Sequence, residues 1–531
     1  MIRPRLLLLC LTFLAASPAL CKQCAVIHLP PPTPADTALR EGDYEEAEKL
    51  YSTALEKTPA DEAALSGLVL SQLYQQHIDA ALTSVQDAIK HLPSSALLQA
   101  DLAEVHFRQG HLPEARAAFE RAIALDACNP RTYFVESRYL RAHSMYASAR
   151  DRINTAHQLS PNDPQITSAW MATQPAVVRT EGLKARVEDK NAPGDQNASA
   201  AAHLQDMEAI HKAQSERGKC RVVSHVTSIK MPFTWIMRDA SHIEAFALDV
   251  RINDKATARL QIDTGASGIL IRRGIAQKAG LVPLVHTKIL GIGDQDAQNS
   301  YLAIADDLKI GQFEFQNCPV EVSDSRRVVD EDGLIGGDVF RDYLLTIDFP
   351  DRSLAIDPLP QRPADDHAAS LDGTGFSDDS TPHDAYIAPE MKDWTRVLRF
   401  GHDLLVQVGL GDSKTRWFVL DTGAFATSLS PEAARAVTKV SHDPDFEIKG
   451  LNGKVKDVLT ARNVEVTFGN VRQRLEDAAV FNLDKESRAT GFDISGFLGF
   501  GTLQYLTMQI DYRDGLVHFK YDPKHGTNRL F

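Results

Sequence analysis

The sequence lacks the short motifs of several common enzyme chemistries. It contains no G-x-S-x-G serine motif, no H-E-x-x-H zinc motif and no G-x-x-x-x-G-K-S/T phosphate loop. The acidic run at 364–367 (Ala-Asp-Asp-His) offers metal ligands, but a solvated run is the better interpretation because the surrounding stretch is of low complexity. We therefore expect neither a metal nor another cofactor.

Positive charge and long apolar runs are also scarce. The formal net charge is −14, which disfavours a nucleic acid or an anionic membrane as partner. The N-terminus has Arg3 and Arg5, an apolar run over 6–16 and a small-residue cleavage site at 17–19. Because this run is short for a membrane span, and no later run approaches twenty residues, we expect a signal peptide over 1–19. The expected location is periplasmic or secreted, with no integral membrane span.

Cysteine is rare, and its arrangement leaves the redox chemistry open. The chain has six cysteines, namely Cys10, Cys21, Cys24, Cys128, Cys220 and Cys318. Removal of residues 1–19 leaves five, so at least one lies outside an intramolecular disulfide, and the pairing stays open. Cys21 and Cys24 could form a redox or metal pair, although no second ligand pair lies near them. Lipidation of Cys21 is a further alternative.

A repeat of 34 residues occupies the first third of the chain. Ala47, Ala81, Ala115 and Ala149 follow this spacing, and a second alanine recurs seven residues after each. Small residues let two helices approach closely, and a proline ends most units. The pattern resembles tetratricopeptide repeats over about 35–163, with the Pro-rich run at 30–34 shortening the first helix. This resemblance implies an all-α solenoid with a concave surface for a protein partner; a packing platform is the alternative.

The remainder divides into two β-rich halves of similar size. Residues 164–220 are expected to be a helical or linker segment, with a linker at 181–200 where periodicity is lost. Short β-branched stretches then predict strands over 221–357 and again over 395–525. A Pro/Asp/Ser-rich linker over 358–394 separates the two halves.

Each β-rich half repeats the same ordered motif. Asp263-Thr-Gly-Ala is followed after 73 residues by Gly336, and Asp421-Thr-Gly-Ala is followed after 78 residues by Gly499. Each glycine ends an apolar pair and precedes a short helix, a strand, a tight turn and a last strand. We interpret the two halves as products of a duplication. The alternative is that each Asp-Thr-Gly only makes a turn, because Asp and Gly are ordinary turn residues.

Each half resembles a retroviral-type, or retropepsin-like, aspartic protease lobe, and the pair resembles a fused dimer of such lobes. The resemblance implies two all-β lobes after the all-α solenoid, with Asp263 and Asp421 as the catalytic pair. It also implies supporting roles for Thr264 and Thr422, whose hydroxyls would bond across the lobes, and for Gly265 and Gly423. One departure is Gly501, which stands where the first half has Asp338.

Two adjacent carboxylates suit peptide hydrolysis for a simple electrostatic reason. They cannot both ionise at low cost, so they share a proton and titrate as a pair. One can act as general base on a water while the other polarises the scissile carbonyl. Backbone N–H groups can approach them because Gly265 and Gly423 carry no Cβ.

Glycine-bearing hairpins between the motifs are candidates for flaps that close over a substrate. They lie at 289–311 and 447–469, and their candidate residues are Gly291, Gly293, Gly450 and Gly453. The sequence thus predicts an exported aspartic endopeptidase that acts on a peptide or protein substrate. The alternative is a catalytically inactive exported peptide-binding scaffold. A third possibility is that the lobes pair between chains.

Overall fold

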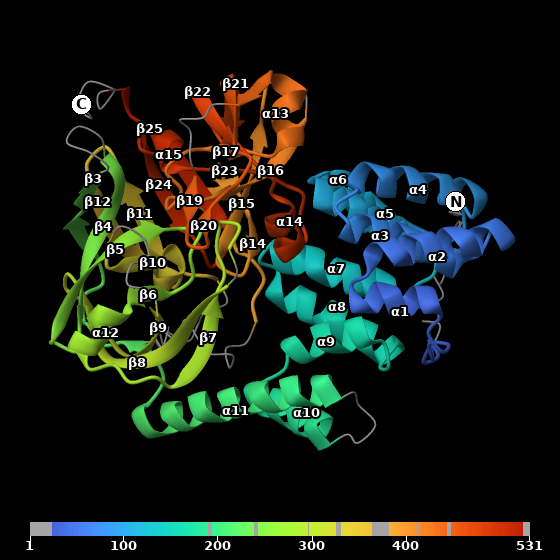
Figure 1. Ribbon diagram of the computed structural model, residues 1–531, viewed down its shortest axis with the longest axis horizontal. Coiled ribbons are helices and arrows are strands. Elements are labelled where there is room, and N and C mark those ends of the chain that lie inside the picture. The colour runs from blue at the N-terminus through green and yellow to red at the C-terminus, as the bar shows by residue number, and fades with distance from the viewer. Residues whose placement is uncertain are drawn as a thin grey trace, which may run out of the picture.

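The computed structural model (Figure 1) describes residues 24–188, 194–237, 243–295, 297–324, 331–363, 382–411, 414–442 and 448–523. The predicted signal peptide, Cys21 and the acidic run at 364–367 lie outside the described residues, as does much of the predicted linker over 358–394. In the described part of the chain, no helix has the length and apolar character needed to cross a bilayer. No group of three or more potential metal ligands occurs in that part either.

Antiparallel helix pairs form the solenoid. They are α1 (Pro34–Glu41) with α2 (Tyr44–Lys57), α3 (Glu62–Tyr74) with α4 (Ile78–His91), α5 (Ala96–Gln109) with α6 (Leu112–Leu125), and α7 (Pro130–Ala142) with α8 (Tyr146–Leu159). The periodic alanines are buried because each lies where two helices touch; Ala47, Ala81 and Ala115 are 0% exposed. Helix α1 has 8 residues against 14 in α2, as the Pro-rich run predicts.

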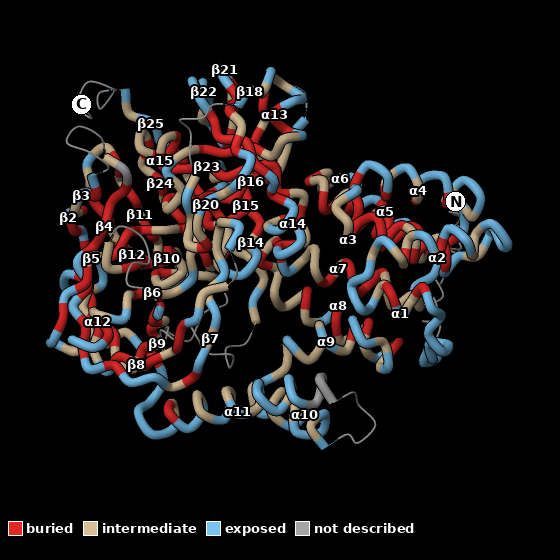
Figure 2. Tube along the Cα trace, in the orientation of Figure 1, coloured by how far each residue is buried: buried red, intermediate tan, exposed pale blue. Residues whose placement is uncertain are grey.

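Helices also fill most of the segment after the solenoid, so the prediction of a linker at 181–200 is wrong. The chain continues through α9 (Pro164–Ala172), α10 (Ala176–Glu188) and α11 (Gly194–Arg217). Helices α10 and α11 pack as a hairpin beside the solenoid (Figure 1), and Lys184 pairs with Glu208 at 3.2 Å. The alanines of this segment favour a helix, but their positions do not indicate which face of the helix is buried. The hairpin is largely exposed (Figure 2), so the sequence carries no apolar period to reveal it.

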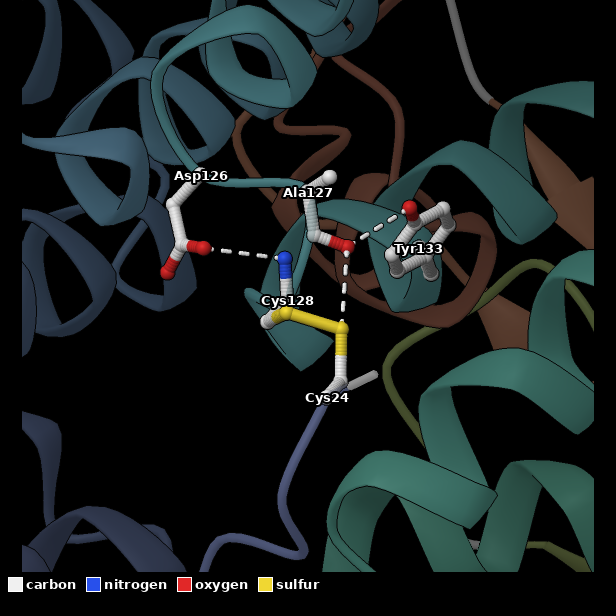
Figure 3. The surroundings of a disulfide bond; sticks show 5 residues. All are labelled: Cys24, Asp126, Ala127, Cys128 and Tyr133. Carbon is white, nitrogen blue, oxygen red and sulfur yellow. Dashed lines mark hydrogen bonds between the residues drawn. A yellow bond between two sulfur atoms is a disulfide. The ribbon is translucent and has the colours of Figure 1, made fainter. Parts of the chain in front are cut away.

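Two disulfides fix segments that are distant in sequence. Cys24 pairs with Cys128, and Cys220 pairs with Cys318. Figure 3 shows the first pair at the turn before α7, where Tyr133 donates to the Ala127 carbonyl at 2.9 Å. The alternative that Cys21 and Cys24 form a redox or metal pair is therefore wrong, because Cys24 is bonded to Cys128. Because the two bridges close loops of 104 and 98 residues, loop-closure entropy gives each about 4–5 kcal/mol of stabilisation.

Lobe 1 (β1 to β12) is built on a mixed sheet. Its strand order is β1 (Arg221–Val222), β9 (Phe313–Ser323), β6 (Ile269–Arg272), β10 (Gly333–Gly336), β5 (Ala256–Asp263), β4 (Ile243–Ile252), β8 (Gln298–Ile310) and β7 (Val285–Ile289), with β3 (Thr234–Met237) beside β4. The short helices are α12 (Arg273–Ala279) and the 3-10 turn η1 (Gly337–Phe340). Strand β5 runs parallel to β10, so Asp263 lies opposite Gly336.

Lobe 2 (β13 to β25) repeats this arrangement. Its sheet runs β14 (Leu398–Phe400), β15 (Asp403–Gly409), β16 (Thr415–Leu420), β23 (Ile494–Leu498), β17 (Ser428–Leu429), β22 (Val471–Val480), β21 (Leu459–Phe468) and β18 (Val440–His442). The helices are α13 (Pro431–Val437), α14 (Asp484–Thr490) and α15 (Phe500–Leu503), and β19 (Lys449–Gly450) pairs with β20 (Gly453–Lys454). Strand β16 runs parallel to β23, as β5 does to β10.

A third sheet joins the two lobes. Its order is β13 (Thr395–Arg396), β25 (Leu516–Tyr521), β24 (Leu506–Asp511), β11 (Tyr343–Asp348), β12 (Ser353–Pro358) and β2 (Ile229–Pro232). The central pair is antiparallel, with Leu345 of lobe 1 opposite Ile510 of lobe 2. Because backbone hydrogen bonds cross between the lobes here, this structure pairs them within one chain.

The solenoid docks directly on lobe 2 (Figure 1). The Phe107 ring lies 4.9 Å from that of Phe492, and Gln407 Nε2 donates to the Gly110 carbonyl at 2.8 Å. Trp417 is 2% exposed and belongs to an apolar cluster drawn from both parts. The solenoid therefore shares a core with the strand that leads to Asp421.

Replacing Trp417 with alanine is expected to lower the free energy of unfolding by about 3–5 kcal/mol, because a cavity opens in this shared core. Urea denaturation measures the change. The matched control is Trp235→Ala, whose side chain is 37% exposed and stacks on Arg352, with an expected loss of about 1 kcal/mol. Equal losses in the two variants would contradict the docking of solenoid on lobe 2.

Candidate active site

The two motif aspartates meet at the interface between the lobes. Asp263 ends β5, and Asp421 follows the last residue of β16. A Cβ placed on Gly265 would lie 2.8 Å from Asp421 Cγ, and one on Gly423 would lie 2.3 Å from Asp263 Cγ. Only glycine fits at these positions, because each carboxyl group fills the space that a side chain of the other lobe would need.

Four hydrogen bonds made by two threonines lock the motifs together. Thr264 Oγ1 donates to the Leu420 carbonyl at 2.6 Å, and Thr422 Oγ1 donates to the Ile262 carbonyl at 2.9 Å. Each threonine hydroxyl also accepts the backbone N–H of the other, at 3.0 and 3.1 Å. Both threonines are buried. The predicted supporting residues thus lie together around the predicted pair, in the crossed arrangement that the family resemblance implies.

Burial raises the pKa of both aspartates, and the charge of Asp421 raises the pKa of Asp263 further, well above its usual value. The donors around the two groups differ. Asp421 accepts N–H bonds from Gly423 and Ala424, both at 2.9 Å, and these oppose the rise in its pKa. Asp263 accepts the Gly265 N–H at 2.8 Å. Asp421 therefore has more backbone donors that can stabilise a negative charge than Asp263 has.

A third acid lies near the pair, beside a histidine. Burial raises the pKa of Asp403 to about 6, although the charge of His402 opposes this. The imidazole Nε2 of His402 lies 3.4 Å from Asp403 and 3.2 Å from the Gly265 carbonyl. No local sequence motif predicts that these residues lie at the site. Asp403 reaches the site through the pairing of β15 with β16, and His402 reaches it by its contact with Gly265 of the other lobe.

Gln261 is a second contributor that the sequence interpretation missed. Its Nε2 donates across the lobes to the Gly423 carbonyl at 3.1 Å. The sequence contained a signal for this residue. Residues two apart on a strand share a face, and Gln261 is two residues before Asp263, so its side chain is expected on the same face as the aspartate. The corresponding residue of lobe 2 is Val419, so the site is not symmetric.

The raised pKa values predict how stability depends on pH. An aspartate whose folded-state pKa exceeds its unfolded value of about 3.9 stabilises the fold below that value, and this contribution is lost as pH rises through the folded-state pKa. The Asp263→Asn/Asp421→Asn variant does not titrate here. Its free energy of unfolding relative to the unsubstituted chain should therefore increase from about pH 4 to about pH 7. Urea denaturation at both pH values tests this, and a constant difference would contradict it.

The two predicted flaps meet tip to tip. Asn452 N donates to the Ile292 carbonyl, and Gln295 N donates to the Asn452 carbonyl, both at 2.9 Å. All four predicted glycines lie at this contact: an added Cβ would lie 2.3 to 2.7 Å from the opposite tip at Gly291, Gly293, Gly450 and Gly453. Larger residues would separate the tips. The structure thus brings two flaps together, as a retroviral-type pair implies.

The lobe 2 flap tip also reaches the motif of lobe 1. Leu451, at the turn between β19 and β20, packs on an apolar patch of Leu270 and Leu334 that also includes Ala266, three residues after Asp263. Figure 1 shows β19 and β20 between the two lobes. The lobe 2 flap tip therefore packs against the segment of lobe 1 that follows Asp263.

Two parts of the chain match the models of known families. Residues 248–339 match the family model "Aspartyl protease", and residues 35–71 and 66–130 match "Tetratricopeptide repeat". "Cellulose synthase operon protein C" of Pseudomonas fluorescens (strain SBW25) is 29% identical over 191 residues, covering 33% of this chain and 15% of that relative. The chain thus spans less than a sixth of that relative's length. The crystal structure of an aspartic proteinase from Irpex lacteus matches with 11% identity and a TM-score of 0.37, over 56% of this chain and 99% of that one.

The predicted family resemblance and fold class are confirmed: an all-α region that matches tetratricopeptide repeats precedes two β lobes, and the first of these lobes matches the aspartyl protease model. The matched protease segment contains Asp263 and ends before lobe 2. The assignment of Asp421 as its partner therefore depends on the internal duplication and on the geometry of the threonine lock.

Proposed function

We propose that the chain is an aspartic endopeptidase that hydrolyses peptide bonds with a water activated between Asp263 and Asp421. The observation that carries this proposal is the threonine lock, which holds the two motif aspartates together at the lobe interface, where burial raises the pKa of both. A turn without a catalytic role does not require two buried carboxyl groups to face each other across a lobe interface, because such an arrangement costs free energy.

The unequal donors assign separate roles to the two aspartates. Asp421, as the carboxylate, takes a proton from the bound water, whose oxygen attacks the scissile carbonyl carbon. Asp263, as the acid, gives its proton to the carbonyl oxygen, which yields a tetrahedral diol. The proton on Asp421 then passes to the leaving nitrogen as the C–N bond breaks, and a diol proton returns to Asp263. No covalent enzyme intermediate forms in this sequence.

The flaps and the solenoid have complementary roles in this proposal. The flap tips separate to admit an extended peptide, which adds to the exposed flap strands, and they close to exclude water. Tetratricopeptide repeats suggest protein interaction, so the solenoid recruits the substrate or a protein partner. Helices α5, α7 and α8 already contact the second half of the chain, so in this proposal the partner binds elsewhere on the solenoid.

We also propose that the protein is exported, to the periplasm or outside the cell. The N-terminal pattern of Arg3, Arg5 and an apolar run supports a signal peptide. Two disulfides give further support, since such bonds persist mainly in oxidising compartments.

A catalytically inactive peptide-binding scaffold is the second candidate function. The observation that favours it is the interlocking of the flap tips, which places Leu451 over the apolar patch of lobe 1. A scaffold of this kind would bind peptides with the flap strands but would not cleave them.

Peptide cleavage distinguishes the two candidates. The purified chain is incubated with a mixture of unstructured peptides from about pH 3 to about pH 8, because a shared-proton pair has a wide potential range. Mass spectrometry records new termini, with the Asp263→Asn/Asp421→Asn variant beside it. Cleavage that the variant lacks supports the endopeptidase. Peptide binding without cleavage at any pH supports the scaffold.

A further inference from the structure

The duplication places different residues at one equivalent position beside the aspartates. Seven residues after the motif aspartate, lobe 1 has Leu270 and lobe 2 has Ser428. Leu270 lies opposite Leu334 on β10, whereas Ser428 lies opposite Phe497 on β23. Leu334 and Phe497 each precede the second-motif glycine by two residues. The same strand geometry therefore carries an aliphatic pair in lobe 1 and a hydroxyl beside an aromatic ring in lobe 2.

The face that carries Ser428 continues across two more strands. Ser428 is registered with Ala479, and Ala479 is registered with Thr460. Residues directly opposite on neighbouring strands point to the same face. The adjacent residues Leu429 and Ala461 point the other way, into the main core of the lobe. The row is thus a second face of the sheet, separate from that core.

Residues of the solenoid and of both flaps pack on the apolar cluster that includes this second face. The apolar members on or beside the row, including Phe497, Phe481 and Val458, belong to one cluster, and Ile448 of the lobe 2 flap packs against it. Ile292, from the flap of lobe 1, packs against the same cluster. This arrangement mirrors lobe 1, where Leu451 of the opposite flap covers Leu270 and Leu334. Separation of the flaps would therefore withdraw Ile448 and Ile292 from the cluster that contains Phe497.

Two hydroxyl groups in this row are buried without a partner. Ser428 Oγ and Thr460 Oγ1 form no hydrogen bond with any described residue, and the two residues are 2% and 1% exposed. An unpaired buried hydroxyl costs about 1–3 kcal/mol, so the fold alone does not favour them. The polar residue of the matching row in lobe 1, Glu321, is satisfied, since it accepts bonds from Ser300 and Thr287.

We propose that this row, which we call the hydroxyl face (Phe497, Ser428, Ala479 and Thr460), is a specificity subsite for a neutral polar side chain of the substrate. The inference rests on the proposed peptidase function and names its substrate class. The carboxamide of glutamine or asparagine fits best, because it both donates and accepts, as the two hydroxyls do.

Charged and aliphatic side chains fit this face less well. A charge buried beside Phe497 and Phe481 would lose its hydration without gaining an opposite charge. An aliphatic side chain would leave both hydroxyls unpaired. Ser428 and Thr460 are two strands apart, which places their Cα atoms roughly 10 Å from each other. The longer glutamine side chain therefore spans more of this distance than the asparagine side chain does.

The test compares cleavage of paired peptides that differ only by Gln, Met or Leu at each residue flanking the scissile bond. We expect the unsubstituted chain to prefer Gln over Met and Leu at one of these positions by about 3- to 10-fold, the value of one net hydrogen bond. Ser428→Ala and Thr460→Val should each reduce that preference several-fold. Ser428→Leu, which reproduces the residue of lobe 1, should reverse it in favour of Leu.

Three controls separate a subsite from a structural role. Thr490→Val also removes a buried hydroxyl of lobe 2, but that hydroxyl has partners in the Glu486 carbonyl and the Phe492 N–H, so the Gln preference should stay unchanged. Ser428→Ala should not lower the free energy of unfolding, because the lost hydroxyl has no partner in the free chain. Calorimetry with the Asp263→Asn/Asp421→Asn variant measures binding of the same peptides independently of turnover.

The outcomes distinguish this inference from the proposed function. Cleavage with no Gln preference, or with the same preference in Ser428→Ala and Thr460→Val, overturns the hydroxyl face and leaves the peptidase in place. Absence of cleavage overturns the peptidase. In that case tighter binding of the Gln peptide, lost in Ser428→Ala, still supports the face as a peptide subsite, and equal binding overturns it.

Discussion

Replacing Asp421 with asparagine is expected to lower the rate of peptide cleavage by at least about 10³-fold, because the amide cannot act as the general base. Asparagine has nearly the same shape, and its side-chain oxygen can still accept the N–H groups of Gly423 and Ala424. The fold should therefore survive. The measurement is the initial rate of cleavage of one peptide, with circular dichroism as the check on folding.

Matched variants make this first prediction specific. Asp263→Asn should reduce the rate to a similar extent, because it removes the acid of the same pair. Asp477→Asn removes an exposed carboxylate that pairs with Arg462, and the rate should stay within about twofold of that of the unsubstituted chain. A folded Asp421→Asn chain that retains a tenth of the original rate would contradict the proposed mechanism.

Replacing Thr422 with valine is expected to damage both stability and catalysis. Valine has the same shape but no hydroxyl, so the Ile262 carbonyl loses a donor and Thr264 N loses its acceptor. Both groups are buried, and each unsatisfied group costs about 1–3 kcal/mol. We expect the free energy of unfolding to fall by about 2–5 kcal/mol. The cleavage rate should fall about 100-fold because the two carboxyl groups lose their fixed separation.

The control for this variant keeps the hydroxyl. Thr422→Ser can form the same bonds, so most of the stability and of the rate should remain. Urea denaturation and peptide cleavage at one pH provide the two measurements. If Thr422→Val and Thr422→Ser lose equal amounts of stability, the hydroxyl is not what joins the lobes, and the account of the lock is wrong.

Features that depend on regular spacing could be predicted from the sequence. The alanine period predicts the helix pairs because each alanine lies at a close helix–helix contact, and Ala115 is indeed fully buried. The duplicated Asp-Thr-Gly predicts the β lobes because strand, turn and glycine recur in order. The same motif places Asp263 and Asp421 together, as the structure does.

Features that depend on contacts between distant segments could not be predicted. The docking of Phe107 on Phe492 follows from tertiary packing and leaves no local period. The disulfide of Cys24 with Cys128 spans 104 residues, and spacing alone does not identify it. Asp403 reaches the site through the pairing of β15 with β16. The α10–α11 hairpin escaped prediction for the opposite reason, since its largely exposed helices carry no apolar period.

The central claim is that Asp263 and Asp421 of one chain form a single catalytic site. The most direct test is to co-express Asp263→Asn chains with Asp421→Asn chains and to measure the rate of peptide cleavage by the mixture. Every chain then lacks one carboxylate, so a site within one chain predicts that the mixture is as inactive as either variant alone. A mixture that cleaves well above either variant would show that the site forms between chains, and would contradict this account.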